Sequence, residues 1–217
     1  MKDSVTNLRT LRKGYEVTFD SGERLYLSNA DFRALPLALD DSLDLSAYRH
    51  DLLLRQYPEA LNRAVGLLAT RARSRAEVER RLTAAGYQPD TVEMVLYKLE
   101  KERLLDDGAF AQAWVAQRSA RGLGAMRLRQ ELRQRGVDEA QASAAIEALA
   151  EEDTLAQAQA LAAKLYRRYA AEPQAEAKRK TLVAMQRRGY RYGEASRALQ
   201  AMLERGDDGC ADDTFDE

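Results

Sequence analysis

Residues 82–87 read Leu82-Thr83-Ala84-Ala85-Gly86-Tyr87, and the same pattern occurs twice more further along the chain. Gly136 stands 50 residues after Gly86, and Gly189 stands another 53 residues after Gly136. In all three copies an apolar residue lies four positions before the glycine, and an aliphatic or aromatic residue follows it directly. This pattern is typical of a helix that ends on a left-handed glycine and closes with a hydrophobic contact. The sequence therefore predicts three helices with the same C-terminal cap.

A second helix is expected after each glycine. Apolar residues recur ten and thirteen positions beyond it, at Leu96 and Leu99, Ile146 and Leu149, and Leu199 and Met202. Another apolar helical segment precedes each pair, near residues 60–71, 108–121 and 154–170. A three-helix unit of this size buries little surface alone. We therefore expect a mainly α protein whose three units stack in tandem into an elongated, curved array.

Capping residues mark several of the expected helix starts. Ser74-Arg75-Ala76-Glu77 is a capping-box pattern, and Pro89 suits the first turn of a helix. Asp107, Asp138 and Asp153 each stand just before an apolar-periodic segment. A carboxylate at such a position accepts hydrogen bonds from free backbone amides and interacts favourably with the helix dipole.

The first 59 residues read differently. Tyr15 to Phe19 and Arg24 to Ser28 alternate with the period of a β-strand, and Asp20-Ser21-Gly22-Glu23 between them is typical of a hairpin turn. Val5 to Leu11 is a candidate third strand, and Leu43 to Tyr57 is predicted to be a linking helix that ends before Pro58.

The predicted organisation has five parts. The β-hairpin and linking helix occupy residues 1–59, and the three helical repeats occupy 60–106, 107–152 and 153–206. Residues 207–217 are acidic and have little to bury, so we expect a disordered tail there. Two roles for the tail stay open, which are shielding of the basic middle of the chain and simple solubility.

The composition excludes several classes of site. Cys210 and His50 are the only cysteine and histidine, which excludes a disulfide framework and a Cys/His zinc site. There is no Walker loop, and Gly122-Leu123-Gly124 lacks the third glycine and the preceding strand of a dinucleotide fingerprint. We expect no catalysis, no metal and no cofactor. No apolar run approaches the roughly 20 residues of a membrane span, and the chain opens with no secretory signal, so we expect a cytoplasmic monomer.

Charge is distributed unevenly along the chain. Residues 60–135 hold 15 basic and 9 acidic side chains, a net charge of +6, whereas residues 1–59 carry −2 and residues 136–217 carry −5. Of the 34 basic residues 27 are arginine, which either a GC-rich genome or selection for bidentate anion binding explains. The basic middle favours a polyanion or an acidic protein surface as partner.

Seven arginines are candidate contacts for such a partner. Arg129 and Arg133 share a helix face with no acid three or four positions away, and an external anion would relieve their repulsion. A solvated surface that reflects codon bias explains the same pattern. Arg127, Glu131 and Arg135, by contrast, can pair with one another. The full set of contact candidates is Arg118, Arg121, Arg129 and Arg133 in the second unit and Arg71, Arg73 and Arg75 in the first.

Apolar residues at helical spacing are interpreted as core. Phe110 and Trp114 lie four positions apart on one face of a helix, which predicts a buried aromatic pair. The predicted core residues are Phe110, Trp114, Leu128, Leu132, Leu82, Leu96, Ile146 and Leu199.

The second unit resembles the central signature of the RecX family. The matching residues are Leu105-Asp106-Asp107, Phe110-Ala111, Trp114-Val115, Arg118, Gly122, Gly124, Arg127-Leu128, Glu131-Leu132 and Arg135-Gly136-Val137. The likeness extends over about residues 58–205, through Arg73-Ser74-Arg75 and Gly86-Tyr87 in the first unit and Gly189-Tyr190 in the third.

This resemblance implies a modulator, most often an inhibitor, of the RecA recombinase in DNA repair and recombination and the SOS response. Such proteins lodge in the groove of the RecA–single-stranded-DNA filament and reduce ATP hydrolysis, strand exchange and co-protease activity. The partners implied are thus the RecA filament and single-stranded DNA.

Two other functions stay open. The helix–turn–helix pairs resemble those of an autonomous DNA-binding protein, which would bind duplex DNA without RecA. A helical-repeat scaffold for another protein is the third candidate.

Overall fold

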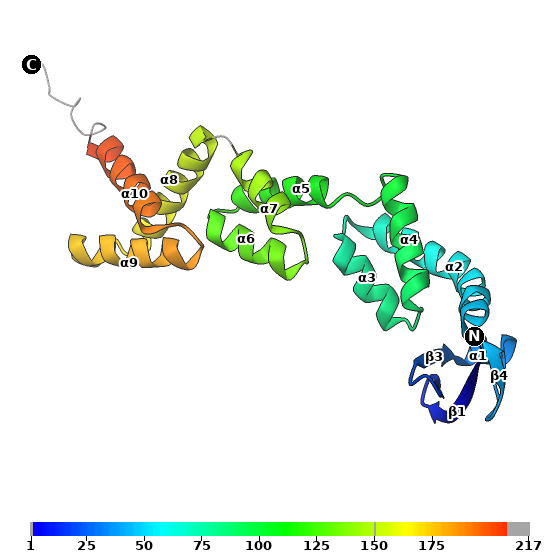
Figure 1. Cartoon of the computed structure of the whole chain (residues 1–217). Helices are drawn as coiled ribbons and strands as arrows, with labels where there is room; N and C mark the ends of the chain where they lie inside the picture. Colours follow the sequence, from blue (N-terminus) through cyan, green and yellow to red (C-terminus); the bar gives the residue numbers. More distant parts are fainter. Residues whose placement is uncertain (1, 150, 208–217) are drawn as a thin grey trace, which may run out of the picture. The chain divides into compact units, whose positions relative to one another are not determined.

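The computed structural model describes residues 2–149 and 151–207, and the chain divides into two compact units, residues 1–106 and 107–217 (Figure 1). The first unit holds a small sheet, a short helix and the first helical repeat. The second unit holds the second and third repeats. None of the helices in the described ranges is long and apolar enough to cross a membrane.

The sheet of the first unit contains four antiparallel strands in the order β3-β2-β1-β4. They are β1 (Lys2–Leu11), β2 (Gly14–Phe19), β3 (Arg24–Ser28) and β4 (Ser42–Asp44). The predicted hairpin and third strand are confirmed, and Gly22 has the expected positive φ of 85°. Strand β4 was missed because three residues of Ser-Leu-Asp are too short to show an alternating pattern.

One face of the sheet packs on the first helices. Its core includes Val17, Phe19 and Leu27, and Leu52 from helix α2 (Leu45–Thr70) completes it. Helix α1 (Asn29–Ala34) is capped by Ser28, whose hydroxyl accepts a hydrogen bond from the amide of Asp31.

Helix α2 runs from Leu45 to Thr70 and contains Pro58, so the predicted end before this proline is wrong. Proline in a helix interior costs about 3 kcal/mol. Apolar packing offsets that cost, because Leu52 lies in the core of the sheet while Ala60 and Ala64 lie in the core of the first repeat. The boundary placed between residues 59 and 60 therefore falls inside a continuous helix.

A buried glutamine joins the sheet to the first repeat. Gln56 of α2 is 3% exposed, and its Nε2 donates to Oδ2 of Asp31 at 2.9 Å. Its Oε1 accepts from the backbone amide of Gln88 at 2.9 Å and from the hydroxyl of Thr91 at 3.1 Å. The side chain of Gln88 donates in turn to the carbonyl of Tyr26 in β3. These bonds fix how the N-terminal sheet docks on the repeat.

The three predicted repeats are present. Repeat 1 consists of the second half of α2 with α3 (Arg75–Ala84) and α4 (Pro89–Lys101). Repeat 2 consists of α5 (Asp107–Ser119), α6 (Ala125–Gln134) and α7 (Glu139–Glu147). Repeat 3 consists of α8 (Glu151–Arg167), α9 (Gln174–Arg187) and α10 (Tyr192–Asp207). Each repeat has an apolar cluster of its own.

The glycine caps behave as predicted. Gly86, Gly136 and Gly189 have φ values of 94°, 78° and 93°. In each repeat the amide after the glycine donates to the carbonyl four residues before the glycine, at 3.4 Å in repeat 1, 3.1 Å in repeat 2 and 3.3 Å in repeat 3. This is the Schellman arrangement, in which the cap satisfies carbonyls that the helix leaves free.

Most of the other sequence predictions for the repeats hold. Ser74 and Asp138 cap their helices, and Pro89 lies in the first turn of α4. Asp107 and Asp153 do not stand before their helices as predicted, because Asp107 is the first residue of α5 and α8 begins at Glu151. Asp207 is the last residue of α10, and residues 208–217, where a disordered tail was expected, lie outside the described residues.

Six of the eight predicted core residues are buried, namely Leu82, Leu96, Phe110, Leu128, Leu132 and Leu199. Ile146 and Trp114 are only half-buried and pack at the edge of the repeat 2 core. The prediction that these two are interior is therefore wrong. For Trp114 the reason is its polar indole N–H, which needs a partner at the rim of the core.

Candidate functional site

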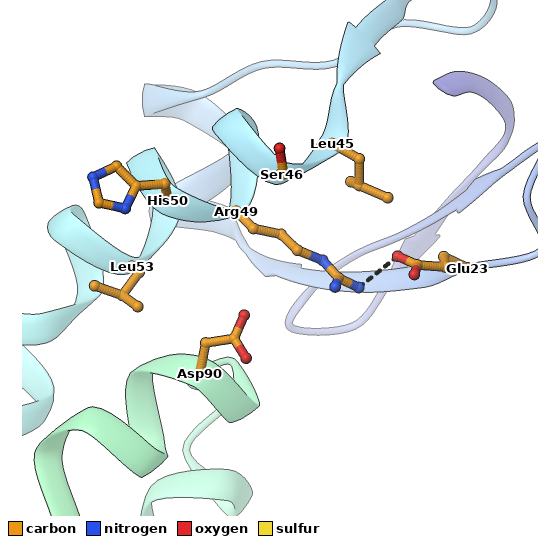
Figure 2. Close-up of a pocket in the computed structure, with 7 residues that line it drawn as sticks. All are labelled: Glu23, Leu45, Ser46, Arg49, His50, Leu53 and Asp90. Atoms are coloured by element: carbon orange, nitrogen blue, oxygen red, sulfur yellow. Dashed lines mark hydrogen bonds and ion pairs between the residues drawn. The ribbon is translucent and has the colours of Figure 1, made fainter. Parts of the chain in front are cut away.

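A polar hollow of about 470 Å³ lies in the first unit between the β2–β3 turn and the starts of α2 and α4 (Figure 2). Arg49 crosses it and pairs with Glu23, the guanidinium Nη2 lying 2.6 Å from the carboxylate oxygen. His50 is exposed at the edge, and within the part of the chain that the structure describes no hydrogen bond joins it to Asp90 or Ser46. The hollow thus holds an ion pair and offers no nucleophile–base arrangement.

Two guanidinium groups lie over the ring of a half-buried tryptophan in repeat 2. The Cζ atoms of Arg118 and Arg135 lie 4.4 and 3.7 Å from the ring centre of Trp114. The indole Nε1 donates to Oε2 of Glu131 at 3.1 Å, and Nε of Arg118 lies 3.2 Å from the same oxygen. The side chain of Glu131 is 15% exposed. Its carboxylate pairs with both Arg118 and Arg127.

This cluster refines the pairing expected from sequence. Glu131 does pair with Arg127, at 3.7 Å, but its shorter contact is with Arg118 from the preceding helix. Arg135 instead stacks on Trp114. A cation over an aromatic face is stabilised by about 0.5–2 kcal/mol, so the cluster orients two arginines at the surface of repeat 2.

The candidate arginines of repeat 1 are held by their neighbours. Arg75 contacts the carboxylates of Glu93, Glu100 and Glu79 at 2.7, 2.9 and 3.5 Å. Burial lowers its pKa, but the bonds and charges of Glu93 and Glu100 outweigh burial, and the pKa is raised. Arg71 lies 3.0 Å from Glu77.

Arg73 of the same repeat is also engaged. Its Nε donates to the carbonyl of Leu67 at 3.0 Å, near the end of α2. Burial and the charge of Arg71 lower its pKa. All three candidates thus have structural partners within repeat 1.

The candidates of repeat 2 divide into two pairs. Arg118 and Arg129 have carboxylate partners, Arg129 lying 2.8 Å from Glu139 of α7. Sequence spacing missed that partner because it comes from the next helix. Arg121 and Arg133 are exposed, and neither of them forms an ion pair with another described residue.

Repeats 2 and 3 meet through backbone. The amide of Gly124 donates to the carbonyl of Arg188 at 2.9 Å, and the amide of Met126 donates to the carbonyl of Gly189 at 3.1 Å. The Nη1 of Arg188 donates to the carbonyl of Arg121 at 3.2 Å. Sequence reasoning missed this contact, because no local pattern relates positions more than 60 residues apart.

Three family models match the chain in order. They are the first, second and third three-helix domains of RecX, and they match residues 60–99, 106–146 and 151–199. The regulatory protein RecX of Halorhodospira halophila is 38% identical over 64% of this chain and 84% of its own length. The chain belongs to the RecX family.

Other RecX proteins are similar to this chain in sequence or in fold. The regulatory protein RecX of Corynebacterium efficiens is 38% identical over 69% of this chain and 75% of its own length. A crystal structure of RecX from Lactobacillus salivarius has a TM-score of 0.66 at 21% identity and covers 70% of this chain and 99% of its own. A second RecX crystal structure has a TM-score of 0.64 at 22% identity and covers 93% and 99%.

Proposed function

We propose that this chain is a non-catalytic regulator of RecA that binds the RecA–single-stranded-DNA filament and inhibits its activity. Membership of a family of regulatory proteins supports the proposal. The observation that carries it is the state of repeat 2, where Arg121 and Arg133 are exposed and have no ion pair among the described residues. Free guanidinium groups on a surface of paired charges favour an anionic partner.

We rank the proposed contact residues by the interactions within this chain that each would have to break in order to bind the partner. Arg121 and Arg133 can bind an anion without breaking an ion pair. Arg118 and Arg129 would exchange Glu131 and Glu139 for the partner. Arg71, Arg73 and Arg75 would have to leave their partners in repeat 1, so they rank last.

The first experiment measures ATP hydrolysis by RecA on single-stranded DNA as purified protein is added. We expect inhibition at substoichiometric amounts, because a protein lodged in the filament affects more than one protomer. No change at any ratio would reject the proposal. Tight binding to duplex DNA in the absence of RecA would instead favour an autonomous DNA-binding protein.

The second experiment compares charge-neutralised variants. The double variant Arg121→Gln and Arg133→Gln should lose inhibition by about tenfold or more. Its melting should change little, because substitutions of exposed residues usually stay within about 0.5 kcal/mol. Arg24→Gln is the matched control, because Arg24 is an exposed arginine of β3 outside the basic middle. Equal effects of control and double variant would contradict the assignment.

A further inference from the structure

The end of helix α9 and the start of helix α6 cap each other. The first amides of a helix have no acceptor within the helix, and its last carbonyls have no donor. Gly124, the N-cap of α6, has no side chain to accept such an amide. Its own amide and that of Met126 bond instead to the carbonyls of Arg188 and Gly189, at 2.9 and 3.1 Å. Each helix therefore satisfies groups that the other leaves free.

This close approach requires glycine on both sides. A Cβ on Gly124 would lie 2.5 Å from the backbone of Gly189, and a Cβ on Gly189 would lie 2.4 Å from the backbone nitrogen of Arg127. Gly124 has an ordinary φ of −81°. Glycine is therefore needed at position 124 for the close contact with repeat 3, and not for an unusual backbone conformation.

The same contact brings two arginines of different repeats together. The guanidinium of Arg188 donates to the backbone carbonyl of Arg121 at 3.2 Å, so the charged end of Arg188 lies beside the main chain that carries the Arg121 side chain. Both residues are exposed, and neither has an ion pair among the residues that the structure describes. Two positive charges carried by residues that touch each other attract an anion more strongly than one does.

We propose that the backbone contact between Gly124 and Gly189 is a positioning device that presents Arg121 and Arg188 as one binding site for a backbone phosphate of single-stranded DNA. A phosphate offers several acceptor oxygens to two guanidinium forks, which suits a pair of arginines better than a single one. The inference rests on the proposed function, because the DNA meant is that of the RecA filament. It adds that repeats 2 and 3 bind as one rigid element.

Hydrogen exchange tests the positioning device without RecA or DNA. The amides of Gly124 and Met126 have no intrahelical acceptor, so their protection reports only the contact with α9. We expect both to exchange at least tenfold more slowly than they would in an open first turn. Unprotected amides at these two positions, with Leu128 protected, would overturn the device whatever the protein does to RecA.

The variant Gly124→Ala tests what the contact does. The added methyl group must push the end of α9 away, while the backbone of residue 124 keeps an allowed conformation. We expect loss of protection at Met126 and about a tenfold loss of filament binding. Gly193→Ala is the matched control, because a Cβ there meets nothing within 4 Å. Lost protection with unchanged binding would overturn the proposal.

A double-mutant cycle tests the shared phosphate. Arg121→Gln, Arg188→Gln and the double variant are titrated with an oligodeoxythymidylate alone and with the RecA filament on it. We expect the two substitutions to be coupled in the native background and to act independently in Gly124→Ala. Arg168→Gln, at an exposed arginine beyond the end of α8, should be independent of Arg121 in both backgrounds. Independent effects of Arg121 and Arg188 on both probes would overturn the site. Coupling on the oligonucleotide without any effect on RecA would support the site and reject the proposed function.

Discussion

Arg103 occupies a backbone conformation that suits glycine. Its φ is 57°, and the amides of Arg103 and Leu104 donate to the carbonyls of Glu100 and Leu99 at the end of α4. This is the same cap that the three glycines make, with an arginine in the left-handed position. A side chain in this conformation destabilises the folded state by about 1–2 kcal/mol. Glycine avoids that strain but loses more conformational entropy on folding, which offsets part of the gain.

We therefore predict that Arg103→Gly raises the free energy of unfolding by about 0.5–1 kcal/mol. Chemical denaturation measures the change. Arg81→Gly is the control, because Arg81 lies inside α3 and glycine there should destabilise by about 1 kcal/mol. Destabilisation of similar size by both substitutions would contradict the role of the positive φ.

The partly buried hydroxyl of Tyr48 should make the folded protein less stable at alkaline pH. Its hydroxyl donates to the carbonyl of Leu35 at 2.7 Å, and burial, helped by the charge of Asp31, raises its pKa to about 12. The unfolded chain loses this proton near pH 10, whereas the folded protein keeps it up to about pH 12. The unfolded state thus binds fewer protons in this window, so the free energy of unfolding falls as the pH rises.

Thermal melts between pH 9 and pH 12 test this in the native protein and in Tyr48→Phe. We expect a smaller decline in the variant, because it lacks the titrating hydroxyl. Tyr97→Phe, at an exposed tyrosine, should keep the decline of the native protein. Parallel curves for native protein and Tyr48→Phe would show that this hydroxyl does not couple to folding.

At the scale of elements, Gly86 does more than cap α3. A Cβ on Gly86 would lie 2.8 Å from the ring of Tyr26 in β3, and the hydroxyl of Tyr26 is fixed on the carbonyl of Lys13 at 2.9 Å. The capping glycine of repeat 1 is therefore also where the sheet approaches that repeat. Gly22 has a similar φ but open space around it.

We predict that Gly86→Ala destabilises the first unit more than Gly22→Ala does. In both variants the positive φ lowers the free energy of unfolding by roughly 1–2 kcal/mol, because alanine is strained there. In Gly86→Ala the clash with Tyr26 lowers it by about 1–3 kcal/mol more. Denaturation of the two variants gives the difference, and the same pair in a Tyr26→Ala background should show it reduced. An equal loss at both glycines would contradict a tight contact between sheet and repeat.

At the scale of the whole molecule, the four apolar clusters define the halves of the chain. Two clusters lie entirely within residues 5–105 and two within residues 110–199. A cut between residues 106 and 107 leaves every cluster intact. A cut between 59 and 60 divides α2 and separates Gln56 from Thr91.

We predict that the fragments 1–106 and 107–217 each fold and melt cooperatively by circular dichroism. The fragment 60–217 should lose the helicity of repeat 1, because it lacks the first half of α2 and the buried Gln56 bonds. Full helicity in that fragment would mean that repeat 1 does not depend on the N-terminal sheet.

The three helical repeats can be predicted from the amino-acid sequence alone. Their glycine caps, apolar spacings and capping side chains are local, because a helix end is satisfied within a few residues of itself. The hairpin was equally local, since the turn and the alternation lie side by side in the chain. Pro58 lies inside α2 although proline disfavours a helix interior locally, because the packing of residues distant in sequence outweighs that local cost.

Which arginines of the described residues lack an ion pair depends on the three-dimensional packing of the helices. Arg129 looked unpaired because its partner Glu139 belongs to the next helix, and Arg75 is held by glutamates of α4. Gly124 and Arg188 gave no sign of each other across 64 residues of sequence. The physical reason is that backbone caps depend on neighbours in the chain, whereas charge pairs and close helix contacts depend on neighbours in space.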